Sequence, residues 1–297
     1  MITQQQVSQY REEGWLVVPD LLNDILRQRM KEALAQWIEQ SRAVTDHTEV
    51  FDLERGHSAA EPRLRRIKQP HVNHPVFEEF IRSQPVLAVL EALLGPGLRL
   101  QSSKLNLKSP RFGSPVEWHQ DWAFYPATND DILAVGVMLD DTSLENGAML
   151  VVPGSHKGPT YDHHDADGRF CGALDPNAPG LGLERAVPIV GRAGAVSFHH
   201  VRAIHGSAQN RSTMSRNFLL YEVCAADAFP LLGVPDFDAF NARLLQGEPT
   251  IVPRFRDAPV RMPLPPALNQ GSIYENQSAS GKRFFEQVEV PRQAAST

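Results

Sequence analysis

The apolar and polar residues of the first hundred positions follow the pattern of amphipathic helices. Between residues 26 and 38 the apolar side chains recur every three or four positions, so one face of this segment is expected to lie on a core. Asn23 stands where it can cap the start of that helix. Residues 76–94 form a further helical stretch, in which Pro85 is expected to be the first residue of a second helix and Gly95 the stop signal.

A shorter helix and a strand are expected ahead of these segments. Thr3 and Gln6 have the spacing of a capping box, in which each side chain bonds the backbone of the other residue. Gly14 ends that helix, and residues 15–18 have the apolar, β-branched character of a strand. Residues 1–97 are therefore predicted to form a mainly helical layer.

Short runs with strand character replace the helical pattern after residue 97. They are separated by Gly, Pro, Asn and Asp, and no long helix is expected between them. Asn146-Gly147 precedes the fourth run and is a strong signal for a hairpin turn. The runs cover residues 98–108, 116–124, 132–140, 148–153, 186–190, 195–200 and 218–225. The pattern favours a fold that is mostly β with helices, a jelly-roll core under the N-terminal helical layer.

We expect the 297 residues to form one domain. Its parts are the helical layer 1–97, the jelly-roll core 98–228 and a loop-rich segment 229–297. Residues 162–183 and 229–269 are rich in Pro, Gly and Asp, and they are expected to be long loops that cover an active site. The tail from Gln287 onward is expected to be extended or partly disordered.

Charge and cysteine content narrow the classes of function. The chain carries 29 basic and 35 acidic residues, and this net charge of −6 argues against nucleic acid or an anionic membrane surface as a partner. Only 2 cysteines occur, with no CxxC pair, so no disulfide framework is expected. No secretory signal and no membrane-spanning apolar run are evident. We expect a cytoplasmic protein, a monomer or homodimer, that acts on a small-molecule substrate.

The tripeptide His119-Gln120-Asp121 is the first candidate for chemistry. In a strand, positions i and i+2 point to the same face, so His119 and Asp121 are expected to project together. A metal site needs a third ligand from another strand, and residues 198–207 offer several histidines. Two histidines and one carboxylate on one face of an ion leave three positions open, which is typical of iron(II) oxygenases. A chelating 2-oxo acid and molecular oxygen fill these positions. By itself, however, such a tripeptide arises mostly by chance.

Four sequence blocks in a fixed order make this signal specific. They read YREEGWLVV from residue 10, HQD from residue 119, ENGAMLVVPGSHK from residue 145, and HGS from residue 205 followed by Asn210, Arg211, Ser212 and Arg216. In these blocks the chain resembles the phytanoyl-CoA dioxygenase-like branch of the iron(II)/2-oxoglutarate oxygenases. The resemblance covers most of the chain. It implies a double-stranded β-helix of cupin type and hydroxylation of a C–H bond in a small organic molecule, with release of succinate and CO2.

The resemblance also implies roles for individual residues. Iron(II) would be held by His119, Asp121 and His205. The far carboxylate of 2-oxoglutarate would pair with Arg216, because a planar guanidinium offers a carboxylate two parallel hydrogen bonds. Ser207 would support that carboxylate. Halogenating members of the class lack the acid, so Asp121 indicates hydroxylation, with desaturation and ring formation left open.

Further positions are expected near the reacting groups. Lys68 and Lys104 match looser contact positions for the oxo acid. Trp122 and Tyr125 follow the metal motif and are candidates to line the substrate pocket, although aromatic residues there are at least as often packing residues. Asn106 is a polar residue between two leucines and either points into the pocket or bonds a sheet edge.

Several other side chains compete for these roles. His199 and His200 are rivals of His205, and the HGS block favours His205. His156 is expected to be structural, and His163 and His164 are expected to lie in a solvated loop. Arg211 is a rival clamp nearer to His205, but Arg216 heads a strand, which holds geometry better than a loop does. The basic residues Arg63, Arg65, Arg66 and Lys68 would meet an anionic ligand or, for most of them, solvent.

Two other functions fit parts of the pattern. A cupin-type hydrolase or isomerase uses zinc or manganese on the same kind of ligands. A catalytically silent binding module would keep the fold and lose a ligand or the clamp. The presence of Arg216 argues against the first, and the presence of all four residues argues against the second. The sequence does not identify the substrate.

Overall fold

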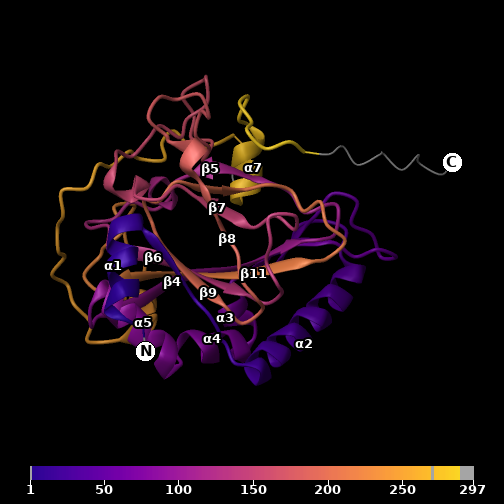
Figure 1. The fold of residues 1–297 in the computed structure, drawn as a ribbon, viewed down its shortest axis with the longest axis horizontal. Coiled ribbons are helices and arrows are strands. Elements are labelled where there is room, and N and C mark those ends of the chain that lie inside the picture. The colour runs from indigo at the N-terminus through magenta and orange to yellow at the C-terminus, as the bar shows by residue number, and fades with distance from the viewer. Residues whose placement is uncertain (1, 269–270, 288–297) are drawn as a thin grey trace.

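The computed structural model describes residues 2–268 and 271–287, and its centre is a pair of antiparallel sheets that face each other (Figure 1). The larger sheet has eight strands in the order β1-β9-β6-β11-β4-β3-β2, with β12 beside β4. The smaller sheet has the order β5-β10-β7-β8. The strands are β1 Trp15–Val18, β2 Phe51–Leu53, β3 Leu64–Lys68, β4 Leu98–Lys108, β5 Val116–His119, β6 Ile132–Met138, β7 Met149–Val151, β8 Val187–Ile189, β9 Val196–His200, β10 His205–Ser207, β11 Arg216–Ala225 and β12 Leu244–Gln246. Together the two sheets form the double-stranded β-helix expected for the core.

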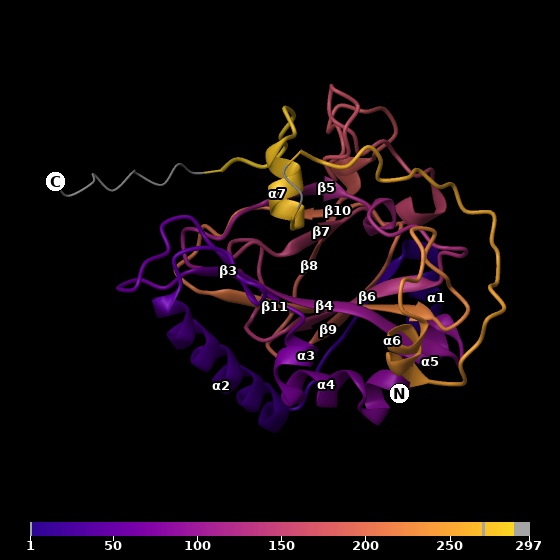
Figure 2. The ribbon, with the colours of Figure 1, turned by 180° about the vertical axis from the view of Figure 1, so that it is seen from behind.

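Helices cover the outer face of the larger sheet (Figures 1 and 2). The helices among the described residues are α1 Gln4–Glu13, α2 Asp24–Gln40, α3 Pro70–Asn73, α4 Pro75–Ile81, α5 Gln84–Leu94, α6 Phe237–Ala242 and α7 Ile273–Ser278. Figure 2 shows α2, α3 and α4 along this face, while α7 lies near β5 on the opposite side of the molecule. In the part of the chain that the structure describes, no helix is long and apolar enough to cross a membrane.

Alternation along the strands of the larger sheet separates two environments. On β11, Leu219 and Tyr221 are buried in the apolar cluster under the helices. Phe218 and Leu220, at the intervening positions, belong to a second cluster that includes side chains of the smaller sheet. Since successive side chains of a strand point to opposite faces, the even-numbered positions of β11 face the space between the sheets. Those positions include Arg216.

Most predictions for the N-terminal layer are confirmed. The capping box of Thr3 and Gln6 is present, Gly14 ends α1 in the left-handed conformation, and Asn23 caps α2. Pro85 is the second residue of α5 rather than the first, because Gln84 already belongs to the helix. The strands β2 and β3 in this layer were not predicted, and they extend the larger sheet here.

The strand predictions hold for the core with three corrections. Residues 98–108 form a strand with the predicted bounds, but the predicted strand 116–124 ends at His119 and gives way to a short 3-10 helix, Asp121–Ala123. Two strands, β10 and β12, were not predicted. Asn146-Gly147 does form a turn, with Gly147 at φ 82, but β6 and β7 on either side belong to different sheets, so the turn does not close a hairpin.

The two segments predicted as long loops are largely irregular. Residues 162–183 contain an isolated bridge between His164 and Phe170, and the segment after residue 229 contains α6 and β12. The predicted loop 229–269 ends at a position outside the described residues. The predicted extended tail lies almost wholly outside them too, because the description stops at Gln287.

Gly14 joins α1 to β1 at a point where the chain has no room for a side chain. Its φ is 80, and a Cβ atom built on it would lie 2.4 Å from Nδ1 of His156. His156 is buried, and its Nε2 lies 3.2 Å from the Arg11 carbonyl oxygen. This imidazole therefore has the structural role that was expected for it.

Replacement of Gly14 by alanine is expected to lower the free energy of unfolding by about 2 kcal/mol or more. The left-handed backbone and the collision with the imidazole both contribute to this loss. Urea denaturation followed by circular dichroism measures it. Gly281→Ala is the matched control, because a Cβ atom there meets nothing within 4 Å. Equal stability of the two variants would contradict the assignment.

Candidate active site

Three buried ligand side chains converge between the two sheets. His119 ends β5, His205 begins β10, and the two residues are register partners in the smaller sheet. Asp121 follows immediately after β5. One ligand atom from each of His119, Asp121 and His205 lies within 4.8 Å of the others, which is close enough for a single ion to bind all three.

Asp121 reaches the two histidines through a different local structure from the predicted strand. The chain leaves the strand after His119, so the two side chains are not i and i+2 neighbours on one strand. The 3-10 helix is held in place by the bond from the Trp122 amide to the Val201 carbonyl, at 2.9 Å. Its turn still directs the carboxylate to the imidazole, and His119 Nε2 lies 3.6 Å from Asp121 Oδ1.

Hydrogen bonds select the ring nitrogen that each histidine offers. His119 Nδ1 lies 2.8 Å from the Glu117 carbonyl oxygen, and His205 Nδ1 lies 3.0 Å from that of Ala203. A carbonyl oxygen only accepts, so both Nδ1 atoms carry the proton and both Nε2 atoms keep a lone pair. Burial also holds the pKa of His205 well below its ordinary value, which keeps this ring neutral.

The carboxylate is charged in this setting. Burial alone would raise the pKa of Asp121, but His205, His119, His199 and Lys104 together more than offset this effect and hold the pKa well below its usual range. Two imidazoles and one carboxylate are a suitable donor set for a divalent first-row metal ion.

His199 lies beside this group but is not part of it. The side chain is 1% exposed, and neither ring nitrogen has a hydrogen-bond partner in the described part of the chain. Its Nε2 atom lies 3.6 Å from Asp121 Oδ2, and its ring centroid lies 4.6 Å from that of His205. Of the two rivals, it is therefore His199 that faces the site, whereas His200 lies against Tyr10 and His156.

An inner cavity of about 50 Å³ lies next to the three ligands. Strands of both sheets contribute to its wall. Its lining consists of Lys104, Asn106, Val116, His119, Asp121, Ala134, Met149, His199, His205, Gly206, Ser207, Arg216, Phe218, Leu220 and Ile273. The metal ligands, Ser207 and Arg216 therefore share one chamber.

Arg216 is a buried cation without a carboxylate partner. It is 3% exposed, and its Nε and Nη2 atoms donate to the Gly147 carbonyl at 3.2 and 2.6 Å. None of the ion pairs among the described residues includes it. Burial lowers its pKa to about 10, so the guanidinium stays charged at neutral pH. A buried charge in this state is unfavourable until an anion binds beside it.

Lys108 is a second buried cation that the sequence analysis did not identify. Its Nζ donates to Ser207 Oγ at 2.8 Å and also to the Ala208 carbonyl. Burial, and then the nearby Arg216, lower the pKa of this ammonium well below its ordinary value. Lys108 is the register partner of Arg216 across β4 and β11, so the strand pattern of residues 98–108 contained a signal for it.

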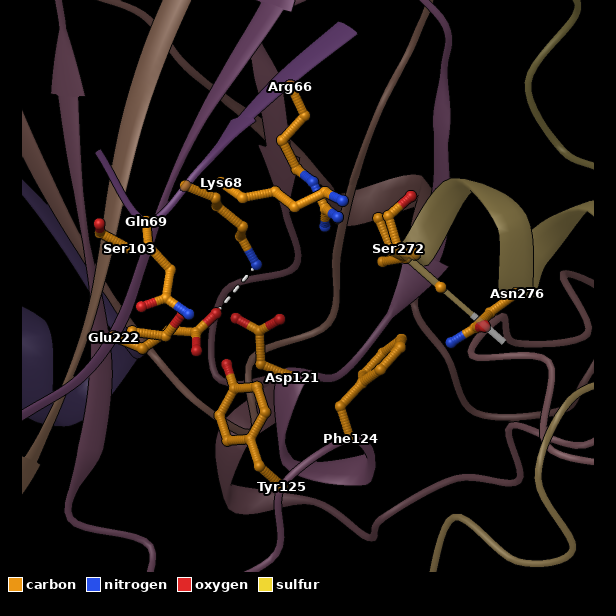
Figure 3. A pocket seen from close by; sticks show the side chains of 14 residues that line it. Arg66, Lys68, Gln69, Ser103, Asp121, Phe124, Tyr125, Glu222, Ser272 and Asn276 are labelled. Atoms are coloured by element: carbon orange, nitrogen blue, oxygen red, sulfur yellow. Dashed lines mark hydrogen bonds and ion pairs between the residues drawn. The ribbon is translucent and has the colours of Figure 1, made fainter. Parts of the chain in front are cut away.

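A larger outer cavity of about 310 Å³ opens from the same place (Figure 3). Asp121 and Lys104 line both cavities. Lys104 Nζ lies 2.9 Å from Glu222 Oε1, and both side chains are largely buried. Tyr125 points its ring toward the two carboxylates in Figure 3, and burial raises the pKa of its phenol well above the ordinary value. Glu222 is another functional candidate that was missed, although a single acidic residue in the run 218–225 is a signal for it.

The structure separates the remaining predicted site residues. Asn106 lies in the inner cavity, and Tyr125 and Lys68 lie in the outer one. Trp122 does not fit a substrate-contact role. It is 0% exposed, packs in an apolar cluster with Ile132, and donates from Nε1 to the Pro259 carbonyl at 2.9 Å.

Two loop residues also depart from the expectation. Arg211 is exposed and pairs with Glu286 at 2.7 Å, away from both cavities. His163 is buried rather than solvated. Its Nδ1–H donates to the Tyr161 carbonyl at 2.9 Å, and its Nε2 accepts from the Gln120 amide at 2.9 Å. His163 thus holds the backbone between His119 and Asp121.

Acid is expected to weaken the fold through His163. Burial lowers the pKa of His163 from 6.5 to about 3. This neutral ring stabilises the fold fully above about pH 6.5, and the contribution is lost as the pH falls toward 3. His163→Gln keeps an acceptor for the Gln120 amide and is expected to reduce the fall by up to about 1.4 kcal/mol per pH unit.

Urea titrations between pH 7 and pH 4 measure this dependence as the slope of the free energy of unfolding against pH. His164→Gln, in the same loop, controls for disturbance of the segment. An unchanged slope in His163→Gln would show that this imidazole is not responsible.

Comparison with known proteins points in one direction. The sequence profile of the phytanoyl-CoA dioxygenase family matches residues 10–218. A probable alpha-ketoglutarate-dependent hypophosphite dioxygenase of Stutzerimonas stutzeri is 36% identical over 284 residues, which are 95% of this chain and 99% of that protein. The ectoine dioxygenase of Bordetella parapertussis is 27% identical over 233 residues, with coverage of 73% and 74%.

Solved structures share the fold. The non-haem alpha-ketoglutarate-dependent carbocyclase SnoK of nogalamycin biosynthesis matches with a TM-score of 0.64 and 25% identity, over 84% of this chain and 93% of that one. EctD from S. alaskensis with bound Fe matches with a TM-score of 0.63 and 21% identity, over 76% and 77% of the two chains.

Proposed function

The chain belongs to the phytanoyl-CoA dioxygenase family, and from this membership we propose how its residues carry out an oxygenase reaction. The enzyme is an iron(II)- and 2-oxoglutarate-dependent dioxygenase that hydroxylates a small molecule. Its co-substrates are 2-oxoglutarate and O2, which yield succinate and CO2. What remains to be assigned is the part that each side chain plays.

We assign the metal to His119, Asp121 and His205. The donor set fits iron(II), because the two Nε2 lone pairs and the carboxylate meet within 4.8 Å and leave the other side of an ion open. When bound, the iron would activate O2, with 2-oxoglutarate oxidised to succinate and CO2. The protein holds both rings in one tautomer through the Glu117 and Ala203 carbonyls, and it keeps water out of the chamber by burial.

Arg216 carries the proposal for the co-substrate. It is a buried guanidinium that pairs with no carboxylate among the described residues, and it lies in the same chamber as the three ligands. The far carboxylate of 2-oxoglutarate would supply a negative charge beside this guanidinium, and the three ligands in the same chamber would hold the metal for the oxo-acid end. Lys108 donates to the hydroxyl of Ser207, which lines the same chamber.

The same residue disfavours the two rival functions. A zinc or manganese hydrolase has no use for an unpaired guanidinium near the ligands, and a silent module does not need to bury it at a cost in stability. The substrate enters from the outer cavity, whose lining residues are mostly of polar or charged type. The relative from Stutzerimonas stutzeri is named for hypophosphite, which supports a small polar substrate here as well.

Loss of a metal ligand is expected to abolish turnover. His119→Ala and Asp121→Ala each remove a donor, so the consumption of 2-oxoglutarate should fall by at least about 10²-fold, with weaker iron binding. Succinate release and anaerobic iron(II) titration measure the two effects. His164→Ala, an imidazole outside both cavities, is the control. Retained iron affinity in both ligand variants would refute the metal assignment.

Removal of the clamp is expected to act on the co-substrate alone. Arg216→Gln should raise the KM for 2-oxoglutarate by roughly 10- to 100-fold, as for the loss of a hydrogen bond between charged groups. Iron binding should be retained. Arg211→Gln, the exposed rival, should leave the KM within about twofold of the wild type. Equal effects of the two variants would remove Arg216 from this role.

A further inference from the structure

The outer cavity has a basic wall made by neighbouring strands of the larger sheet. Arg66 and Lys68 lie on β3, and Lys104 lies on β4 as the register partner of Lys68. All three side chains line the cavity, and Figure 3 shows Arg66 and Lys68 extending into it from the same strand. The intervening residue Ile67 is fully buried in the apolar cluster under the helices. Alternation therefore places the cations on the cavity side.

The charges of this wall do not balance. Arg66 Nε lies 2.6 Å from Asp52 Oδ2, and Lys68 Nζ lies 3.2 Å from Asp52 Oδ1, so a single buried carboxylate serves two cations. Lys104 is matched by Glu222 at 2.9 Å. Asp121 belongs to the metal group. One positive charge remains at the Arg66 and Lys68 end of the cavity.

We propose that Arg66 and Lys68 bind the anionic group of the primary substrate, which is a small oxyanion with a carboxylate, phosphinate or phosphonate group. This inference rests on the proposed function, because it takes the outer cavity as the substrate site. Guanidinium and ammonium groups supply charge-assisted hydrogen bonds to such oxygens. The Lys68 side chain is 31% exposed and can reorient toward a ligand, while Arg66 is held by Asp52.

The rest of the lining favours a compact, polar ligand. Among the residues around this cavity only Phe124, Tyr125 and Ile273 present large apolar or aromatic surfaces. The remaining contacts are hydroxyl, amide and charged groups, including Gln69 and Asn276. The polar and charged side chains of this lining suit a polar ligand rather than an acyl chain.

The positions of the two acids orient the ligand. Glu222 repels an anion, and it lies beside Lys104 at the junction with the inner cavity. The oxyanion is therefore directed to the Arg66 and Lys68 end, and the bond to be oxidised points toward Asp121 and the metal. Lys68 lines only the outer cavity, whereas Arg216 lines only the inner one. These positions assign substrate and oxo acid to different cations.

Direct binding tests this proposal without turnover. The iron(II)- and 2-oxoglutarate-loaded enzyme is titrated anaerobically by calorimetry with hypophosphite, methylphosphonate, acetate and L-proline as probes. At least one of the three oxyanions is expected to bind, with an affinity that falls as salt is added. Lys68→Gln should weaken that binding about tenfold or more. Arg185→Gln, an exposed arginine outside both cavities, should not change it.

A second variant guards against a folding defect. Arg66→Gln alone would leave the buried Asp52 carboxylate with only Lys68 as its cation. The double variant Asp52→Asn with Arg66→Gln removes one charge of each sign, and its affinity for the oxyanion is also expected to fall. The affinity for 2-oxoglutarate is measured on the same samples and should stay within about twofold of the wild type, since Arg216 is intact.

Different outcomes test the proposed anion site and the proposed function separately. If Lys68→Gln weakens 2-oxoglutarate and not the oxyanion probes, Lys68 holds the co-substrate and the proposal is overturned. If L-proline binds and none of the three oxyanions does, the site recognises a zwitterion and the proposal is again overturned. Failure of the wild type to bind 2-oxoglutarate at all would count against the proposed function instead, whatever the oxyanion titrations show.

Discussion

This site depends on a positive charge that is buried between the two sheets and that pairs with no carboxylate of the described residues. The guanidinium of Arg216 is hydrogen-bonded to the Gly147 carbonyl, and in the described part of the chain it forms no ion pair. Such a group is unfavourable in the empty protein and favourable beside an anion. The long β4 and β11 ladder holds it rigidly, so a ligand meets a preformed charge rather than a flexible one.

The same alternation of side chains builds both the core and the cavities. Leu105 and Leu107 of β4 and Leu219 and Tyr221 of β11 pack under the helices. The alternate positions between and beside them carry Lys104, Lys108, Arg216 and Glu222 toward the space between the sheets. A sandwich normally fills that space with apolar residues. Here one end is apolar, where Met138 and Phe218 of the larger sheet belong to one cluster with Met149 and Val151 of the smaller sheet, and the other end is charged. The fold is stable because the first end supplies the packing.

How much of the structure could be predicted from the sequence depended on whether the signal was local. Caps, glycine stops and the strand 98–108 are local and were predicted closely. The metal group depended on His205, whose placement came from the resemblance and not from periodicity. The sequence analysis missed Glu222 and Lys108, and it left Arg66 between an anionic ligand and solvent. Alternation shows that a polar side chain leaves the core, but it does not show whether that side chain then meets water or a cavity. The turn after His119 was missed since its anchor, the Val201 carbonyl, is distant in sequence.

Lys104 and Asp121 form part of the wall of both cavities, and this shared wall has a thermodynamic consequence. A ligand that changes the charge around Lys104 in one chamber alters the field felt in the other, so the affinities of the two chambers are linked. Linkage of this kind is reciprocal: whatever factor the first occupant contributes to the second, the second returns to the first. The coupling between the two ligands therefore depends on one lysine and one carboxylate.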